Sequence, residues 1–188
     1  MSNIKLVHSG GNSVSLTTPD SNPAANRTLK VPGNADGTVL TDTYKPVFFA
    51  RNNNTQSISN NTSTKIQFDA EVFDSHGYYD HSTNYRFTPQ LAGYYYITAS
   101  IYYVNVNNVY AIDIKKNGSR YVNCDFRHNF AASRSAFISS LVSFNGSSDY
   151  VEIFGYHTTG SSITIANGQQ YSINEFSGHF VRALVWAH

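Results

Sequence analysis

The chain has 188 residues, which is the length of one domain, or of one domain with a short attached segment. Thirteen basic and twelve acidic residues give a net charge of +1, which excludes the strongly basic surface of a typical nucleic-acid binder. Aromatic residues make up 14% of the chain and charged residues only 13%, a composition that favours β-strands and excludes a helical bundle.

The one cysteine, Cys124, excludes an intrachain disulfide. Residues 1–11 lack the apolar run of a secretory signal peptide, and no stretch reaches the roughly 18 apolar residues that a membrane span needs. We therefore predict a protein that is made in a reducing cytoplasm and does not insert into a membrane.

Residues 1–43 contain no Phe, Tyr or Trp. Apolar residues alternate with polar ones at Ile4 and Leu6 and again at Val14 and Leu16, which predicts short strands separated by turns. Because ordering a residue costs about 1–2 kcal/mol of conformational entropy, a segment this poor in apolar side chains cannot build its own core. We predict an arm that is held by its own domain or by a neighbouring chain.

Residues 44–188 form the second predicted domain and hold all the aromatic residues. Asn-Gly pairs and other turn signals separate many short apolar runs, a pattern typical of an all-β sandwich or barrel. The strands are expected at residues 46–50, 64–72, 94–104, 109–115, 136–144, 150–154, 162–166 and 178–186.

The strand predicted at residues 94–104 has two different faces. One carries Tyr95, Ile97 and Tyr103, and the other is aromatic but hydroxylated, which suits contact with another subunit or a wet surface. The last predicted strand is apolar on both faces, which indicates a sheet covered within an oligomer. A neighbouring loop over its outer face is the alternative.

Six segments of the second domain follow one another in a recognisable order. They are PVFFA at 46–50, STKIQF at 63–68, YRFTPQLAGYYYI at 85–97, IKKNG at 114–118, DYVEI at 149–153 and FSG at 176–178. In this order and spacing they resemble the C1q/TNF-like superfamily. The resemblance implies a ten-stranded jelly-roll sandwich that assembles as a homotrimer.

Some features depart from the family pattern. The glycine that usually precedes Asp149 is absent, so residues 145–148 look like a longer turn, and Ile97 replaces the usual phenylalanine. No calcium-ligand motif of the family matches, so no cofactor is carried over. The candidate residues for the trimer interface are Tyr95, Ile97, Tyr103, Phe180, Leu184 and Trp186.

The N-terminal segment carries a second resemblance. Its runs KLVHSGGNSVSL (5–16), PDSNPAANRTL (19–29) and PGNADGTVL (32–40) are similar to the leader of virion structural proteins in tailed phages, notably those of marine bacteria. This implies that residues 1–43 are an attachment or assembly arm, which contacts other virion proteins and carries the jelly-roll domain of residues 44–188.

The densest cluster of titratable side chains consists of Asp74, His76, Asp80 and His81. Carboxylates and imidazoles this close can bind a divalent cation, whereas ordinary turn chemistry in a solvated loop explains the same residue types and is the favoured interpretation. The motifs of serine hydrolases, zinc proteases and phosphate-binding loops are absent, so no enzymatic activity is expected.

Tyrosines in loops are the clearer functional signal. Tyrosine stacks on sugars and peptides at low entropic cost, while ordinary packing at the rim of the jelly roll is the alternative. The tyrosines expected in loops or near strand ends are Tyr78, Tyr79, Tyr110, Tyr156 and Tyr171.

Together these features predict a phage virion protein. We expect a trimeric knob of the tail-fibre or spike type on the virion surface, which binds a host-cell glycan or protein without catalysis. A capsid decoration protein that stabilises the shell is the first alternative, and a secreted C1q-like lectin is the second.

Overall fold

The computed structural model describes residues 4–7, 9–11, 13–16, 45–167 and 174–184. The chain separates into two compact units, Met1–Val39 and Leu40–His188. In the first unit, β1 (Ile4–Val7) and β2 (Ser13–Leu16) form an antiparallel hairpin, as the alternating apolar residues predict. The predicted boundary between residues 43 and 44 lies outside the described residues and stays a prediction.

The second unit is all β in its described part. No helix among the described residues has the length and apolar character to cross a membrane. The strands are β3 (Val47–Arg51), β4 (Gln56–Ile58), β5 (Thr64–Lys65), β6 (Ala70–Asp74), β7 (Tyr79–Asp80), β8 (Arg86–Phe87), β9 (Gly93–Lys116), β10 (Ser119–Phe144), β11 (Val151–His157), β12 (Ile163–Ile165) and β13 (Glu175–Ala183).

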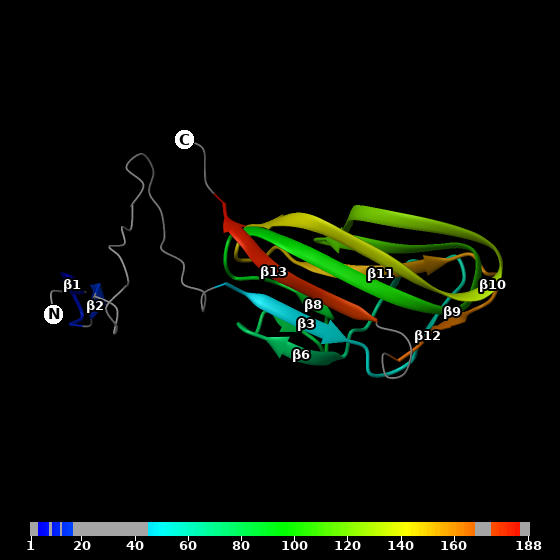
Figure 1. Cartoon of the computed structure of the whole chain (residues 1–188), viewed down its shortest axis with the longest axis horizontal. Helices are drawn as coiled ribbons and strands as arrows, with labels where there is room; N and C mark the ends of the chain where they lie inside the picture. The colour runs from blue at the N-terminus through cyan, green and yellow to red at the C-terminus, as the bar shows by residue number, and fades with distance from the viewer. Residues whose placement is uncertain (1–3, 8, 12, 17–44, 168–173, 185–188) are drawn as a thin grey trace, which may run out of the picture. The chain divides into compact units, whose positions relative to one another are not determined.

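These strands form one hydrogen-bonded sheet that folds into two layers (Figure 1). The first layer contains β6, β3, β13 and the beginning of β9, and the second contains the end of β9 with β11, β8 and β7. Strands β9 and β10 run side by side through both layers as a long ribbon. This arrangement confirms the predicted all-β jelly roll.

The long strand β9 was expected to be two strands, at residues 94–104 and 109–115. The structure instead has one strand with a bend, at which Asn105 and Asn108 have φ angles of 58° and 62°. Asparagine tolerates this left-handed conformation better than most residues, which allows the ribbon to turn from one layer to the other without ending. The Asn117-Gly118 pair then closes the β9–β10 hairpin with positive φ at both residues, as a type I′ turn requires.

The predicted strand at residues 64–72 is also different, because the structure divides it into β5 and β6. Between them Ile66 and Phe68 are both fully buried, and the Ile66 amide donates a hydrogen bond to the Ile153 carbonyl in the second layer. The chain then crosses to the first layer, where β6 pairs with β3. Ile66 and Phe68, two inward-pointing apolar residues on either side of the exposed Gln67, therefore belong to a crossover between layers.

Aromatic rings fill the space between the two layers. Phe48 of β3 stacks on Phe87 of β8 with ring centroids 4.2 Å apart, and it meets Phe176 of β13 edge-on at 4.9 Å. Tyr95 of β9 packs edge-on against Phe144 and Phe180. Such pairs contribute about 0.5–1.5 kcal/mol each beyond their buried area, so the aromatic composition is explained mainly by the core.

Candidate functional site

The outward side of the first layer carries exposed apolar side chains. Successive side chains of a strand point to opposite faces, and the buried residues of β3, β13, β9 and β10 alternate accordingly. The pairing register aligns one outward row across the four strands: Val47, His179, Tyr96 and Leu141. Tyr96 is 38% exposed and Leu141 is 54% exposed, although both are large side chains in the middle of strands.

We call this surface the outer face. Its apolar members are Val47, Phe49, Phe73, Tyr94, Tyr96, Phe137, Leu141 and Val181. Hydroxyl side chains such as Ser177, Thr98 and Ser139 lie between them in the neighbouring row. Contiguous apolar residues on the surface of a soluble domain mark a contact surface for another molecule.

Strand β10 adds an open edge to the outer face. Among the described strands it pairs with β9 alone, and it is 26 residues long. Its exposed apolar residues include Tyr121, Phe137 and Leu141. Natural proteins usually shorten, charge or cover such an edge, because unpaired backbone groups attract other strands. A long edge with exposed apolar residues is therefore suited to being covered by a partner.

The structure corrects the predicted interface residues. Tyr95, Ile97 and Tyr103 have no exposed area, so they belong to the core of one subunit and offer no surface to another. Two of them are tyrosines whose hydroxyls are satisfied internally: Tyr95 donates to the Leu91 carbonyl and Tyr103 to the Ala111 carbonyl. Burial raises the pKa of both phenols well above their usual range.

The other three predicted interface residues lie near the end of β13. Phe180 is buried against Tyr95. A register shift between Phe180 and Arg182 turns Arg182 outward, so these two do not share a face as their spacing suggests. Leu184 is half-buried, and Trp186 lies outside the described residues. The outer face was indicated by the second, hydroxylated side of residues 94–104, but its members on β3, β6 and β10 were missed.

The predicted ligand-binding tyrosines divide into two groups. Tyr79 and Tyr110 are 5% exposed and belong to the core, where Tyr79 donates to the Phe68 carbonyl and Tyr110 stacks on Phe126. This corrects their assignment, and burial raises the Tyr79 pKa above its usual range. Tyr78 and Tyr156 are half-buried at the surface. Tyr171 lies outside the described residues.

The four predicted metal ligands do not converge. No group of three or more His, Cys, Asp or Glu side chains among the described residues is arranged to hold a metal ion. The Asp74 carboxylate accepts the amides of His76 and Tyr79, and His81 lies 3.5 Å from Glu71. The Asp80 carboxylate caps the turn that follows it. The spacing of these residues is explained by turn chemistry.

Tyr78 lines a surface pocket of about 300 Å³. Strands β7 and β8, the turn between them and the residues that flank these strands form its wall. The other lining side chains include Asp80, Asn84, Arg86 and Gln90. The Arg86 guanidinium lies 4.4 Å from the centre of the Tyr150 ring, a cation–π arrangement. Arg86 was missed in the sequence, because nothing local to it indicates that Tyr150 lies beside it.

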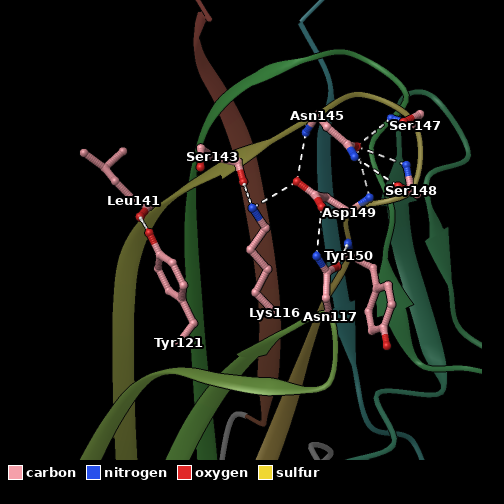
Figure 2. A network of polar contacts seen from close by, with 10 residues as sticks. All are labelled: Lys116, Asn117, Tyr121, Leu141, Ser143, Asn145, Ser147, Ser148, Asp149 and Tyr150. Carbon is pink, nitrogen blue, oxygen red and sulfur yellow. Dashed lines mark hydrogen bonds and ion pairs between the residues drawn. The ribbon is translucent and has the colours of Figure 1, made fainter.

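A polar network fixes the loops at one end of β9 and β10 (Figure 2). The Lys116 ammonium lies 2.9 Å from the Asp149 carboxylate and donates to the Ser143 carbonyl at 2.6 Å. Asn117 donates to Asp149 and accepts from the Tyr150 amide. Asn145 accepts the amides of residues 147–149 with its side-chain oxygen, which makes the turn at 145–148 a closed structural unit.

The charge of Asp149 is stabilised by this network. Partial burial raises the Asp149 pKa, but hydrogen bonds from Asn117 and Lys116 outweigh that effect and leave the pKa below its ordinary value. The ion pair and the hydrogen-bonded turn therefore shape the loop that precedes Asp149. Their role is structural support for the adjacent strands.

Cys124 and two arginines of β10 have surroundings that indicate a structural role. Cys124 is a free, half-buried thiol packed against the core. Arg120 pairs with Asp113 at 3.1 Å, and Arg134 lies 2.8 Å from the His128 ring nitrogen. Arg120 and Arg134 therefore each have a separate local partner.

Comparisons with known proteins agree with this architecture. No protein-family model matches the chain, and no curated protein sequence matches it. Among solved structures, the globular domain of the zebrafish complement 1qA protein has a TM-score of 0.55 at 15% identity, covering 74% of this chain and 99% of that chain.

Two further solved structures have similar scores. Eiger TNF from S. frugiperda has a TM-score of 0.54 at 8% identity, covering 77% of this chain and 96% of that chain. Murine APRIL at pH 5.0 has a TM-score of 0.55 at 10% identity, covering 73% of this chain and 99% of that chain. At these identities the likeness shows the fold alone: the chain has a C1q/TNF-like jelly-roll fold.

Proposed function

We propose that this chain is a non-catalytic structural protein of a phage particle. In this proposal its jelly rolls assemble as a homotrimeric knob on the virion surface, the knob binds a glycan or protein of the host cell, and residues 1–43 attach it to other virion proteins. The observation that carries the proposal is the outer face, because it offers a subunit contact that a monomer would leave exposed to water.

The composition of the outer face supports contact with another protein. Tyr94, Tyr96 and Phe137 are aromatic, and aromatic residues are enriched in protein interfaces while charged residues are depleted from interface cores. The serines and threonines between them can form hydrogen bonds across a partly wet contact. The outer face is more polar than the core between the two layers, because its central row includes His179 beside Tyr96.

The arrangement of the outer face and the β10 edge supports a closed ring. They are different surfaces of one subunit, so a contact in which the edge of one copy covers the face of the next is heterologous. Such contacts generate a ring when the rotation closes, and the family resemblance implies closure after three copies. A trimer also presents three copies of every loop, so weak ligand contacts gain avidity.

The phage context rests on the resemblance of residues 1–43 to virion leaders. A charge-poor, jelly-roll surface domain with a free cysteine is compatible with assembly in a bacterial cytoplasm followed by exposure on a particle. The two versions of this role, a host-binding fibre knob and a shell-stabilising decoration protein, differ in copy number.

Quantitative mass spectrometry of purified particles tests the proposal. A low copy number in multiples of three supports the host-binding knob, and adsorption of the particles to cells should then fall when excess purified protein is added. A copy number that scales with the capsid lattice would replace the knob by a decoration protein. Absence of the chain from particles would overturn the virion role altogether.

A further inference from the structure

The pocket beside Tyr78 has an uncommon distribution of charge. Two opposite charges of the β7–β8 ladder, Asp80 and Arg86, are direct cross-strand partners and both line the pocket. Opposite charges at such positions usually attract each other. Here they form no ion pair, and the reason lies in the turn that follows Asp80.

The Asp80 carboxylate is occupied by its own turn. One oxygen accepts the amides of Ser82 and Thr83 at 3.0 and 2.9 Å, and the other accepts the amide and side-chain nitrogen of Asn84 at 3.1 and 2.7 Å. Hydrogen bonds from the Thr83 amide and its neighbours hold the Asp80 pKa far below its usual range. Both oxygens of the Asp80 carboxylate are therefore hydrogen-bonded within the turn.

Arg86 is left with a different partner. Its guanidinium carbon lies over the Tyr150 ring, 4.4 Å from the ring centre, and this cation–π contact uses none of its N–H donors. Stacked arginines present a planar fork that matches a carboxylate with two parallel hydrogen bonds. The half-buried position of Arg86 also limits the solvent screening of its charge.

The rest of the pocket suits a sugar ring. Tyr78 is half-buried and packs toward His76 and Phe87, so its ring is held in place beside the pocket. The side-chain nitrogens of Asn84 and Gln90 bond to protein groups, and their amide oxygens can accept hydrogen bonds from hydroxyls. A volume of about 300 Å³ is at the lower end of small-molecule sites.

We propose that this pocket binds an acidic saccharide, with the sugar carboxylate on Arg86 and the ring against Tyr78. The inference rests on the proposed host-binding function, because it names the class of glycan that the knob would recognise. Uronic acids and sialic acids share the required chemistry, a carboxylate attached to a hydroxylated ring, and direct binding distinguishes between them.

The experiment is an NMR titration of the full-length protein with three probes: sodium glucuronate, sodium N-acetylneuraminate and glucose. We expect at least one acidic sugar to shift resonances of residues 77–90 and to bind at least about tenfold more tightly than glucose, because only the acidic sugars can use a charge-assisted pair. Binding of glucose with equal affinity, or shifts elsewhere only, would overturn the proposal even without any variant.

Two substitutions sharpen the test. Arg86→Gln should weaken binding of the acidic sugar about tenfold, and Arg86→Lys should restore only part of it because a lysine lacks the planar fork. Arg127→Gln is the matched control, since Arg127 is an exposed arginine of β10 outside the pocket lining, and it should bind as the natural chain does. Unchanged binding by Arg86→Gln would contradict the assignment.

The outcome is separable from that of the proposed function. If purified protein blocks adsorption of particles to cells but no acidic sugar binds, the knob stands and this ligand assignment falls. If an acidic sugar binds at Arg86 but the chain is absent from particles, the site stands and the virion role falls.

Discussion

Asp80 and Arg86 face each other across the β7–β8 ladder without forming an ion pair. Each charge is committed elsewhere, Asp80 to the amides of the following turn and Arg86 to the face of Tyr150. Turn formation thus separates two charges that strand pairing brings together. The separation leaves a cation with free donors at the rim of a pocket, which is the basis for the ligand assignment.

The Asp80 turn is expected to contribute to stability. Asp80→Ala removes the acceptor of three backbone amides and should lower the free energy of unfolding by about 1–2 kcal/mol at pH 7, the scale of losing a carboxylate cap. Chemical denaturation measures this loss. Asp125→Ala, which removes an exposed carboxylate that accepts from Asn123, is the control and should cost much less.

The pH dependence of the Asp80 contribution has a defined sign. Because the folded pKa lies below the unfolded value of about 3.9, the stabilisation is complete above that value and is lost as the pH falls further. The difference in stability between the natural chain and Asp80→Ala should therefore shrink below about pH 4. A difference that stays constant down to pH 2 would contradict this account.

The ion pair between Lys116 and Asp149 should support the loops in Figure 2. Asp149→Asn removes the charge that Lys116 and Asn117 contact, while the Lys116 ammonium stays partly buried, so we expect a loss of about 1–3 kcal/mol in the free energy of unfolding. Glu71→Gln, at the more exposed pair with His81, is the control. Equal effects of the two substitutions in denaturant titrations would show that the network adds nothing.

Gly178 lies where the structure has no room for a side chain. A Cβ atom there would lie 2.6 Å from the end of Ile97 and 2.8 Å from the Phe48 ring, both of which are buried. Gly178→Ala should therefore destabilise the fold by about 1–3 kcal/mol, seen as a lower melting temperature. The neighbouring residue points outward, so Ser177→Ala should leave the melting temperature nearly unchanged. An unchanged melting temperature of Gly178→Ala would contradict the close packing of Gly178 against Ile97 and Phe48.

His157 should make stability depend on pH near neutrality. It is fully buried, and its two ring nitrogens are used by the Ile58 carbonyl and the Thr159 amide, an arrangement that requires the neutral ring. Burial lowers the His157 pKa, partly offset by the hydrogen bond to Ile58. The unfolded chain, with an ordinary pKa of about 6.5, takes up the proton first as the pH falls.

Stability from His157 is therefore complete above about pH 6.5 and declines as the pH falls, by up to about 1.4 kcal/mol per pH unit. Denaturant titrations from pH 7.5 to 5 measure this slope. His157→Gln should be less stable at pH 7.5 but have a flatter profile. A profile of His157→Gln parallel to that of the natural chain would rule out this histidine as the cause.

The sequence predicts much of the fold because the strand signals are local. Alternation identifies the buried side of residues 94–104, and the Asn-Gly pair at 117–118 is a hairpin turn as its composition predicts. The bend within β9 and the short strands β7 and β8 were missed, and β8 is fixed in part by its pairing with β11, which is distant in the sequence.

The site was harder to predict because tyrosine is suited to both core and surface. Tyr95 and Tyr103 are buried with their hydroxyls donating to the backbone carbonyls of Leu91 and Ala111, whereas Tyr96 between them points outward. Tyr78 and Tyr79 are adjacent and both line the surface pocket, yet Tyr79 is buried in the core and Tyr78 is half-buried at the surface. Their different environments depend on the pairing of strands, which no local pattern contains.

The mass of the protein in solution tests the trimer most directly. Light scattering during size-exclusion chromatography should give three times 20.9 kDa, or about 63 kDa, for the natural chain. Leu141→Lys, which places a charge on the outer face, should shift the mass to that of the single chain, while Ser82→Lys, in the exposed turn between β7 and β8 and away from both the outer face and β10, should leave the trimer intact. A natural chain that is monomeric at micromolar concentration, or a Leu141→Lys variant that remains trimeric, would contradict assembly through the outer face.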